Sequence, residues 1–282
     1  MKRTSGLGIA LAAGLLWLGT HPLAASAEPA AMPSCDEQRR LTAQLMATAQ
    51  GQQALDVISA RAALANLDDL RRRFQAGEPL GGPYAGPSRW VQLSRAAADP
   101  VQAELFRRVA KDQFARADTV ASASRTSWAA GLSDGARGIA SAAAFTRDWC
   151  GMDEDNTLWL RQQLRTRGWF RRSTDGPDAD DAALQLVQHA DLDRPFQKEV
   201  LQMIEPLLKT RDTRSQNYAR LFDRVAVGEG RPQRYGSQFR CAGPGMWSEF
   251  PVEDPANLDH RRAEMGLEAM AAYRKRSVQA CP

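Results

Sequence analysis

Apolar residues recur at helical spacing through most of this chain, and that periodicity is the strongest constraint on its fold. The clearest example is "DRPFQKEVLQMIEPLLKT", which places apolar residues at helical spacing: Phe196, Val200, Leu201, Ile204, Leu207 and Leu208. Alanine, leucine, glutamine and arginine dominate, and runs of β-branched residues, which favour strands, are absent. The sequence therefore predicts an all-α protein, an irregular helical bundle or array with a loop-rich C-terminal part.

Glycine and proline divide this helical pattern into segments. "GEPLGGPYAGPS" at 77–88 holds four glycines and three prolines, which is typical of a linker. We expect an N-terminal helical segment at 28–76, a linker at 77–88 and a helical domain at 89–282. Within that domain, Asp99-Pro100 and Asp193 mark helix starts, and Gly168 marks a helix end. After Gly228 the chain turns irregular before two short C-terminal helices.

The first residues indicate export. Lys2 and Arg3 precede an apolar run from Leu7 to Gly19, and Ala25-Ser26-Ala27 has the small-x-small pattern of a cleavage site. A run of about 13 residues is too short to cross a bilayer as a helix, although an uncleaved anchor is the alternative reading. We expect a signal peptide at 1–27 and cleavage near Ala27. The mature protein would be periplasmic or secreted, with no transmembrane span.

All four cysteines follow the expected signal peptide. An even number of cysteines in an oxidising compartment favours two disulfides. The spacing leaves three pairings open, of which we favour Cys35 with Cys150 and Cys241 with Cys281. No spacing matches a zinc site.

The charge pattern argues against nucleic acid as a partner. Loss of Lys2 and Arg3 with the signal peptide lowers the formal net charge from +4 to +2, and acidic residues are interspersed with the arginines. The catalytic, phosphate-binding and metal-binding signatures Gly-x-Ser-x-Gly, Gly-x-x-x-x-Gly-Lys and His-Glu-x-x-His are absent, so no cofactor or metal is assigned. A small polar ligand and another envelope protein remain as partners.

One polar stretch, "VQHADLDRPFQ" at 187–197, stands out because it holds a histidine of the mature chain. His189 could act as a general acid or base, or as a ligand, with Asp191 orienting its ring. The alternative is a helix end, where Asp193 caps the next helix, Asp191 shapes the turn and His189 hydrogen-bonds locally.

A second polar stretch, "EGRPQRYGSQF" at 229–239, offers the same choice. Its Gln233, Tyr235 and Gln238 could present amide and phenol groups to a polar ligand, or they could pin an ordered surface loop. The adjacent Asp223 and Arg224 could form a structural salt bridge or contribute to a site.

Several of these pieces occur in a recognisable order. They are "DQFAR" at 112–116, "DEDN" at 153–156, "GW" at 168–169, "QHADLDRPFQ" at 188–197, "DRV" at 223–225 and "EGRPQRYGSQ" at 229–238. Over about residues 100–275 the chain resembles a bacterial family, the domain of unknown function 6624. It departs from the family pattern at Phe170, where proline is usual, and at Ser237, where threonine is usual. The stretch 118–145 looks inserted.

The resemblance implies an all-helical domain and supplies no activity. The family's signature positions are polar, and in this chain they are Asp112, Gln113, Arg116, Gln188, His189, Asp191, Arg224, Gln233, Tyr235 and Gln238. One hypothesis is an exported protein with a polar ligand-binding or hydrolytic pocket centred on His189 and Asp191. The other is a non-enzymatic, disulfide-stapled envelope module in which the same residues form an internal hydrogen-bond network.

Overall fold

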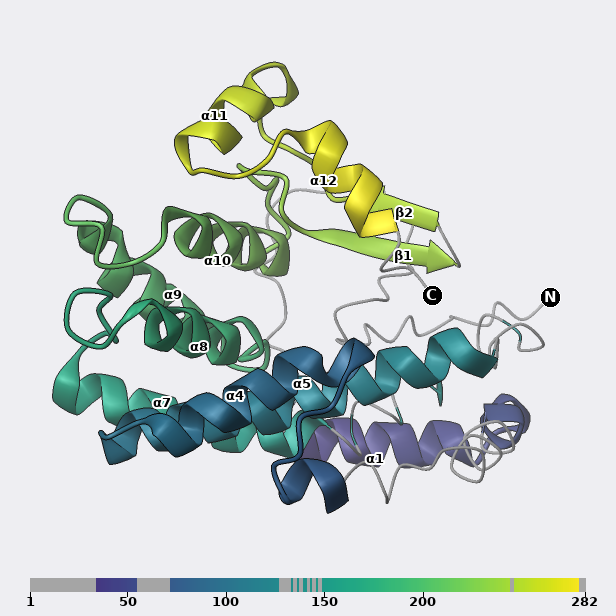
Figure 1. Ribbon diagram of the computed structural model, residues 1–282. Coiled ribbons are helices and arrows are strands. Elements are labelled where there is room, and N and C mark those ends of the chain that lie inside the picture. Colours follow the sequence, from purple (N-terminus) through teal and green to yellow (C-terminus); the bar gives the residue numbers. More distant parts are fainter. Residues whose placement is uncertain are drawn as a thin grey trace.

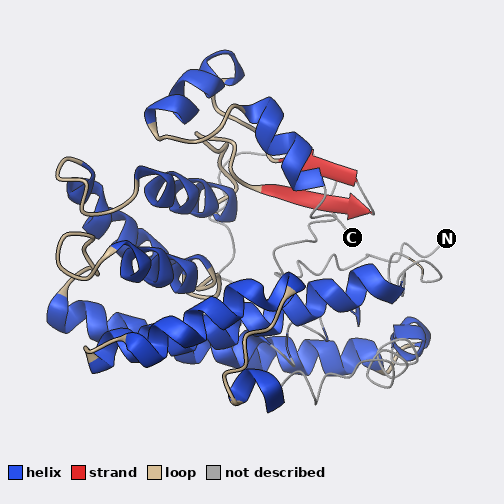
Figure 2. Ribbon diagram, in the orientation of Figure 1, coloured by secondary structure: helices blue, strands red, loops and turns tan. Residues whose placement is uncertain are grey.

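The structure, a computed structural model, is predominantly helical, which confirms the predicted all-α class (Figure 2). It describes residues 34–54, 72–126, 149–243 and 246–278, together with 133, 136, 139, 140, 143 and 146. Within this part of the chain, the strands form a single two-stranded sheet. The signal peptide expected at 1–27 lies outside the described residues and stays a prediction.

The helices form layers in chain order (Figure 1). The lower layer contains α1 (Cys35–Met46), α4 (Ala85–Ala96), α5 (Pro100–Thr126) and α7 (Cys150–Arg167). Above it lie α8 (Pro177–Gln188), α9 (Arg194–Ile204) and α10 (Ser215–Gly228). The top holds β1 (Phe239–Gly243), β2 (Met246–Glu249), α11 (Leu258–Glu264) and α12 (Met270–Ser277). Short 3-10 turns are η1 (Gly82–Tyr84), η3 (Glu205–Leu208) and η4 (Pro255–Asn257).

Helix ends follow the local signals in the sequence. Asp99 accepts a hydrogen bond from the backbone N–H of Val101 at 3.0 Å, directly before α5 begins at Pro100. Gly168 ends α7 with a φ of 73°, a conformation that suits glycine. Asp193 caps α9 by accepting from the N–H of Phe196 at 3.0 Å. These three predictions are confirmed.

The main core forms around α5. Leu105, Val109, Ala110 and Phe114 lie on one face of this helix and are all buried. They pack with residues of α4 and α8, and burial of each large apolar side chain stabilises the fold by about 1.5–3 kcal/mol. Asp112 lies within the same stretch of α5, so the core fixes its position firmly.

Residues 77–88, the expected linker, carry side chains into this core. Leu80 and Tyr84 are buried, and the Leu80 N–H donates to Ser88 Oγ at 2.9 Å. Phe74, near the end of the N-terminal segment, stacks on Phe114 with ring centroids 4.3 Å apart. The segment therefore packs against the domain, and the division of the chain at 77–88 stays a prediction.

A disulfide joins Cys35 at the start of α1 to Cys150 at the start of α7, as we expected. The two Cα atoms are 5.6 Å apart, both cysteines are buried, and the bond closes a sequence separation of 115 residues. Cys281 lies outside the described residues, so its pairing with Cys241 stays a prediction.

The C-terminal part is more ordered than the sequence indicates. Strands β1 and β2 pair in antiparallel fashion, with Phe239 opposite Glu249 and Arg240 opposite Ser248. The Phe239 ring meets the Tyr273 ring of α12 edge-on. The two predicted short helices are confirmed as α11 and α12. Among the helices that the structure describes, none has the length and apolar character needed to cross a membrane.

Candidate functional site

The centre of the candidate site is Asp112, a fully buried carboxylate on α5. It accepts hydrogen bonds from Gln113 Nε2 at 2.7 Å and from Arg116 Nε at 3.0 Å. His189, at the end of α8, places Nδ1 at 2.9 Å from one carboxylate oxygen of Asp112 and 3.0 Å from the other. Helical spacing of four residues puts Asp112 and Arg116 on one face of α5, and the α5–α8 packing brings His189 to them.

The protonation states of this pair follow from its surroundings. Burial opposes ionisation of Asp112, yet its contacts with His189 and Arg116 lower its pKa to about 2. Burial lowers the pKa of His189, although the Asp112 charge opposes this. At neutral pH Asp112 is therefore an anion and His189 is neutral. The anion only accepts hydrogen bonds, so Nδ1 carries the proton and donates it to Asp112.

The other ring nitrogen, Nε2, then carries a lone pair. No hydrogen bond to Nε2 is present among the residues that the structure describes, and 18% of the His189 side-chain surface is exposed. A neutral imidazole in this tautomer is ready to accept a proton or to bind an electrophile through Nε2.

Arg116 connects this pair to a second carboxylate, Asp153, on α7. Arg116 Nη2 donates to Asp153 Oδ1 at 2.6 Å, and the guanidinium lies over the Trp149 ring, 4.8 Å from its centroid. Burial raises the pKa of Asp153 to about 7, helped by the charge of Asp112 and opposed by that of Arg116. Asp153 therefore changes protonation close to neutral pH.

Asp191 has different partners from those that we expected. It accepts from Arg224 Nε at 2.9 Å, forms a second bond with Arg224 Nη2, and accepts from Gln197 Nε2 at 3.2 Å. Burial raises the pKa of Asp191, but the charge and hydrogen bonds of Arg224, the charge of Arg194 and the bond from Gln197 together outweigh burial, and the net shift is downward. The carboxylate that orients His189 is thus Asp112, 77 positions away in the chain.

The two clusters lie close enough to influence each other. The charge of Asp191 contributes to the raised pKa of Asp153, and the charge of Arg224 contributes to the lowered pKa of His189. Residues from α5, α7, the α8–α9 turn and α10 therefore form one polar region.

The loop at 229–238 is held mainly by side chains that bind its backbone groups. Asp223, buried on α10, accepts from the backbone N–H groups of Arg234 at 2.7 Å, Tyr235 at 3.0 Å and Ser237 at 2.8 Å. The Tyr235 ring is buried edge-on against Phe222. We refer to Asp223 and the three N–H groups that it holds as the Asp223 clamp.

Gln233 completes this loop from inside. It is fully buried, its Nε2 donates to the carbonyls of Gln238 at 3.1 Å and Phe250 at 3.0 Å, and its Oε1 accepts from the Gln238 N–H at 2.9 Å. Gln238 itself reaches the site, since its Oε1 accepts from Arg224 Nη1 at 3.3 Å. Of the three loop residues expected at the ligand, Gln238 thus joins the polar region, whereas the bonds of Gln233 go to the backbone.

Four further buried polar residues were not among the family's signature positions, although three of them lie in a motif. Asp153 begins "DEDN", Gln197 ends "PFQ" and Asp223 begins "DRV". The fourth, Asp180, accepts from Trp169 Nε1 of the "GW" motif at 2.7 Å and from Thr213 Oγ1 at 2.7 Å. Their places in the ordered motifs could have identified Asp153, Gln197 and Asp223, whereas Asp180 lies outside the motifs and only the fold brings it to Trp169.

Asp112, Asp153 and His189 each offer an atom that could bind a metal ion, and these atoms lie within 4.8 Å of one another. The Arg116 guanidinium, however, contacts both carboxylates, at 3.0 Å and 2.6 Å. Its positive charge already neutralises these carboxylates and would repel a cation there. This arrangement favours proton transfer at His189 over metal binding.

Comparison with known proteins agrees with the motifs. A family model described as a family of unknown function (DUF6624) matches residues 101–280, which is more than half of the 282 residues. No curated protein and no solved structure matches the chain significantly. The match spans α5 and every element from α7 to α12, and with them the whole polar region around His189. The chain therefore belongs to this family of unknown function, DUF6624.

Proposed function

We propose that this protein is exported and uses His189 as a general base on a polar ligand, most simply in a hydrolytic reaction. The observation that carries the proposal is the pairing of a buried, ionised Asp112 with Nδ1 of a neutral His189 whose Nε2 is uncommitted in the described structure. A carboxylate in this position fixes the imidazole tautomer and would stabilise the imidazolium formed when Nε2 takes a proton.

The neighbouring residues have roles that follow from their contacts. Gln113 and Arg116 hold Asp112, so we assign them to positioning. Asp153 could exchange a proton near pH 7 during a reaction cycle. Arg224 and Gln238 would bind polar groups of the ligand at the rim of the site.

Export is part of the proposal. The leader-like sequence at 1–27 supports it, and so does the disulfide, because disulfides persist in oxidising compartments. Proteolytic mapping of the N-terminus of the protein recovered from a bacterial periplasmic fraction tests it. Export predicts a mature chain that begins after Ala27, and an intact N-terminus in the cytoplasmic fraction would contradict it.

The alternative is a non-enzymatic, disulfide-stapled interaction module. The Asp223 clamp and Gln233 favour it, since these signature residues hold the backbone of the loop. In that case the bond between Asp112 and His189 would be one more internal connection, and loss of the imidazole would mainly lower stability.

A comparison of His189→Gln with His260→Gln separates the two functions. His260 is a matched control because it is the other histidine of the mature chain and its side chain is 75% exposed on α11. Each purified protein is assayed for hydrolysis of p-nitrophenyl acetate, p-nitrophenyl phosphate and p-nitrophenyl glycosides, and for its melting temperature. In addition, ¹⁵N NMR of His189 reports its tautomer and pKa.

General-base chemistry predicts a neutral Nδ1–H tautomer at pH 7 and hydrolysis of at least one probe. His189→Gln would lose about 10²–10⁴-fold of the rate while its fold is kept, and His260→Gln would match the wild type. A charged imidazole at pH 7, or no difference in rate between the wild type and His189→Gln, would refute the proposal. A large fall in melting temperature for His189→Gln with no hydrolysis by the wild type would favour the interaction module.

A further inference from the structure

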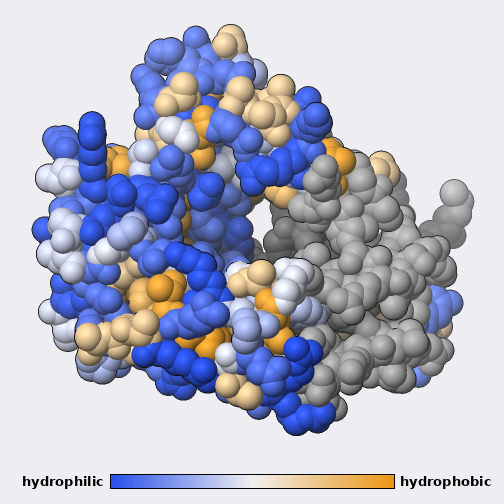
Figure 3. Space-filling view, in the orientation of Figure 1, coloured by the Kyte–Doolittle hydropathy of each residue, from blue (hydrophilic) through white to orange (hydrophobic). Residues whose placement is uncertain are grey.

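A separate cavity lies between the helical layers and the C-terminal part. Its volume is about 400 Å³, and it is lined by residues of α4, α8, α10, α11 and α12 and of the loops between them. Figure 3 shows the molecule hollowed between the C-terminal elements at the top and the helices below. Its volume is within the range of small-molecule sites, and neither Asp112 nor His189 lines it.

Arginines outnumber acids in this cavity by four to two. The two acids are already committed: Asp181 pairs with Arg214 at 3.0 Å, and Glu268 pairs with Arg276. The two other arginines, Arg220 and Arg262, therefore give the cavity two positive charges that its own acids do not neutralise.

Arg262 is a buried cation, only 1% exposed, that lines this cavity. Its guanidinium donates to the backbone carbonyls of Glu268 at 2.7 Å, Tyr235 at 2.6 Å and Gly236 at 3.2 Å. Carbonyl dipoles satisfy its hydrogen bonds but leave its charge in place. Burial lowers the pKa of Arg262, although nearby acids oppose the shift, and no ion pair to its guanidinium is present among the described residues.

Three polar side chains of the cavity have no hydrogen bond or ion pair within the described ranges. They are the guanidinium of Arg220 on α10 and the amides of Gln185 and Gln188 on α8. Arg220 is exposed, so its donors are open to a ligand. The aromatic rings of Trp90 and Tyr273 add apolar surface beside these polar groups.

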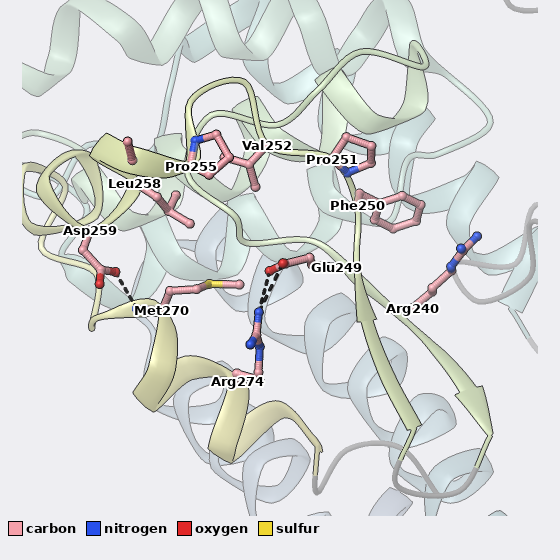
Figure 4. Close-up of a pocket in the computed structure, with 11 residues that line it drawn as sticks. Arg240, Glu249, Phe250, Pro251, Val252, Pro255, Leu258, Asp259, Met270 and Arg274 are labelled. Atoms are coloured by element: carbon pink, nitrogen blue, oxygen red, sulfur yellow. Dashed lines mark hydrogen bonds and ion pairs between the residues drawn. The ribbon is translucent and has the colours of Figure 1, made fainter. Parts of the chain in front are cut away.

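A second cavity, of about 570 Å³, differs from the 400 Å³ cavity in the residues that line it (Figure 4). Its walls are largely apolar, with Phe250, Leu258 and Met270 among them. Of the charged residues that line it, Glu249 and Arg274 are paired at 3.1 Å. Among the described residues that line it, no comparable group of uncommitted polar side chains is present.

We propose that the 400 Å³ cavity binds a small organic anion, a carboxylate or a phosphate ester, with Arg220 contacting the oxyanion. An arginine fork fits either oxyanion through two parallel hydrogen bonds. Gln185 and Gln188 would bind the polar body of the ligand, and the buried charge of Arg262 would add long-range attraction. This proposal does not depend on general-base chemistry at His189.

The test uses the full mature chain with two probes, inorganic phosphate and citrate, and with glycerol as a neutral control. Binding is measured by calorimetry and by the shift in melting temperature, at constant ionic strength, because salt screens such contacts. Arg220→Gln is the test variant. Arg165→Gln is the matched control, since Arg165 is an exposed arginine on α7 outside the cavity.

We expect saturable binding of at least one probe to the wild type and to Arg165→Gln, and binding at least tenfold weaker in Arg220→Gln. Gln185→Glu, which adds a negative charge to the cavity, should also weaken binding. Phosphate binding alone would indicate a phosphate ester, and citrate binding alone would indicate a carboxylate. Binding of neither probe, or equal binding by Arg220→Gln and the wild type, would overturn the proposal.

Discussion

Replacement of Asp112 by asparagine tests the centre of the candidate site most directly. The side chain keeps its shape, but one oxygen becomes an NH₂ group. In either orientation that NH₂ faces a donor, because Arg116 Nε, His189 Nδ1 and Gln113 Nε2 all point at the carboxylate. The variant therefore loses a buried ion pair and places two donors against each other.

The expected loss of stability follows from the burial of the pair. Asp112 is fully buried and 20% of the Arg116 side chain is exposed, so the pair is largely shielded from water. Breaking a buried pair on one side costs about 3–5 kcal/mol. For a chain of this size each kcal/mol lowers the melting temperature by roughly 2–4 °C. Asp112→Asn should therefore melt roughly 6–20 °C below the wild type at pH 7.

The stability lost in Asp112→Asn should also depend on pH, and it should become smaller at low pH. The pKa of Asp112 is about 2 in the folded protein, against an ordinary value of 3.8. The wild type thus gains stability from the ionised carboxylate above pH 4 and loses it as the pH falls through about 2, an effect of about 2 kcal/mol. The stability gap between the two proteins should narrow below pH 4.

Thermal unfolding at pH 7 measures the first effect, and urea unfolding at several pH values between 3 and 7 measures the second. Asp155→Asn is the control: this α7 carboxylate is 72% exposed and pairs with Arg108, so its loss should cost about 1 kcal/mol or less. A melting temperature for Asp112→Asn within 2 °C of the wild type, or a gap that stays constant with pH, would refute the reasoning.

Three further predictions concern other parts of the molecule. Asp223→Asn should lower the free energy of unfolding by about 2–3 kcal/mol, because at least one backbone N–H loses its charged acceptor, and an unchanged urea midpoint would contradict this. Asp153 has a folded pKa of about 7, above its ordinary 3.8, so the wild type should lose stability as the pH rises from about 4 to 7. Asp153→Asn should not show this loss. If the free energy of unfolding of the two proteins changes in parallel with pH, the prediction is wrong. Reduction of the bond between Cys35 and Cys150, or Cys35→Ser, should cost up to about 5 kcal/mol from its long loop, and a melting temperature insensitive to reductant would count against this.

The helices and the core could be predicted from the sequence because their signals are local. The apolar spacing of α5 and α9 and the signals at Asp99, Gly168 and Asp193 all act within a few residues. The hairpin of β1 and β2 was missed because its strands are short. Their positions also depend on contacts with α12, more than 20 residues further along the chain.

The site could be predicted as a set of residue types but not as a set of contacts. The motifs singled out His189 and Asp112, yet nothing in the sequence shows that Asp112 rather than Asp191 holds the imidazole. Likewise, a polar residue in a motif can face a ligand or a backbone amide. Gln233 and Asp223 do the latter, and only the folded chain distinguishes the two cases.

The bond between Cys35 and Cys150 also makes assembly of the site measurable without a ligand. Cys150 begins α7, and Asp153, the second carboxylate partner of Arg116, lies one helical turn further on. The cysteines can meet only when α1 has docked against that first turn. Counting alkylatable thiols on a gel during refolding therefore reports when this end of the polar region has formed. Variants could be ranked by the rate at which these thiols disappear before any substrate is known.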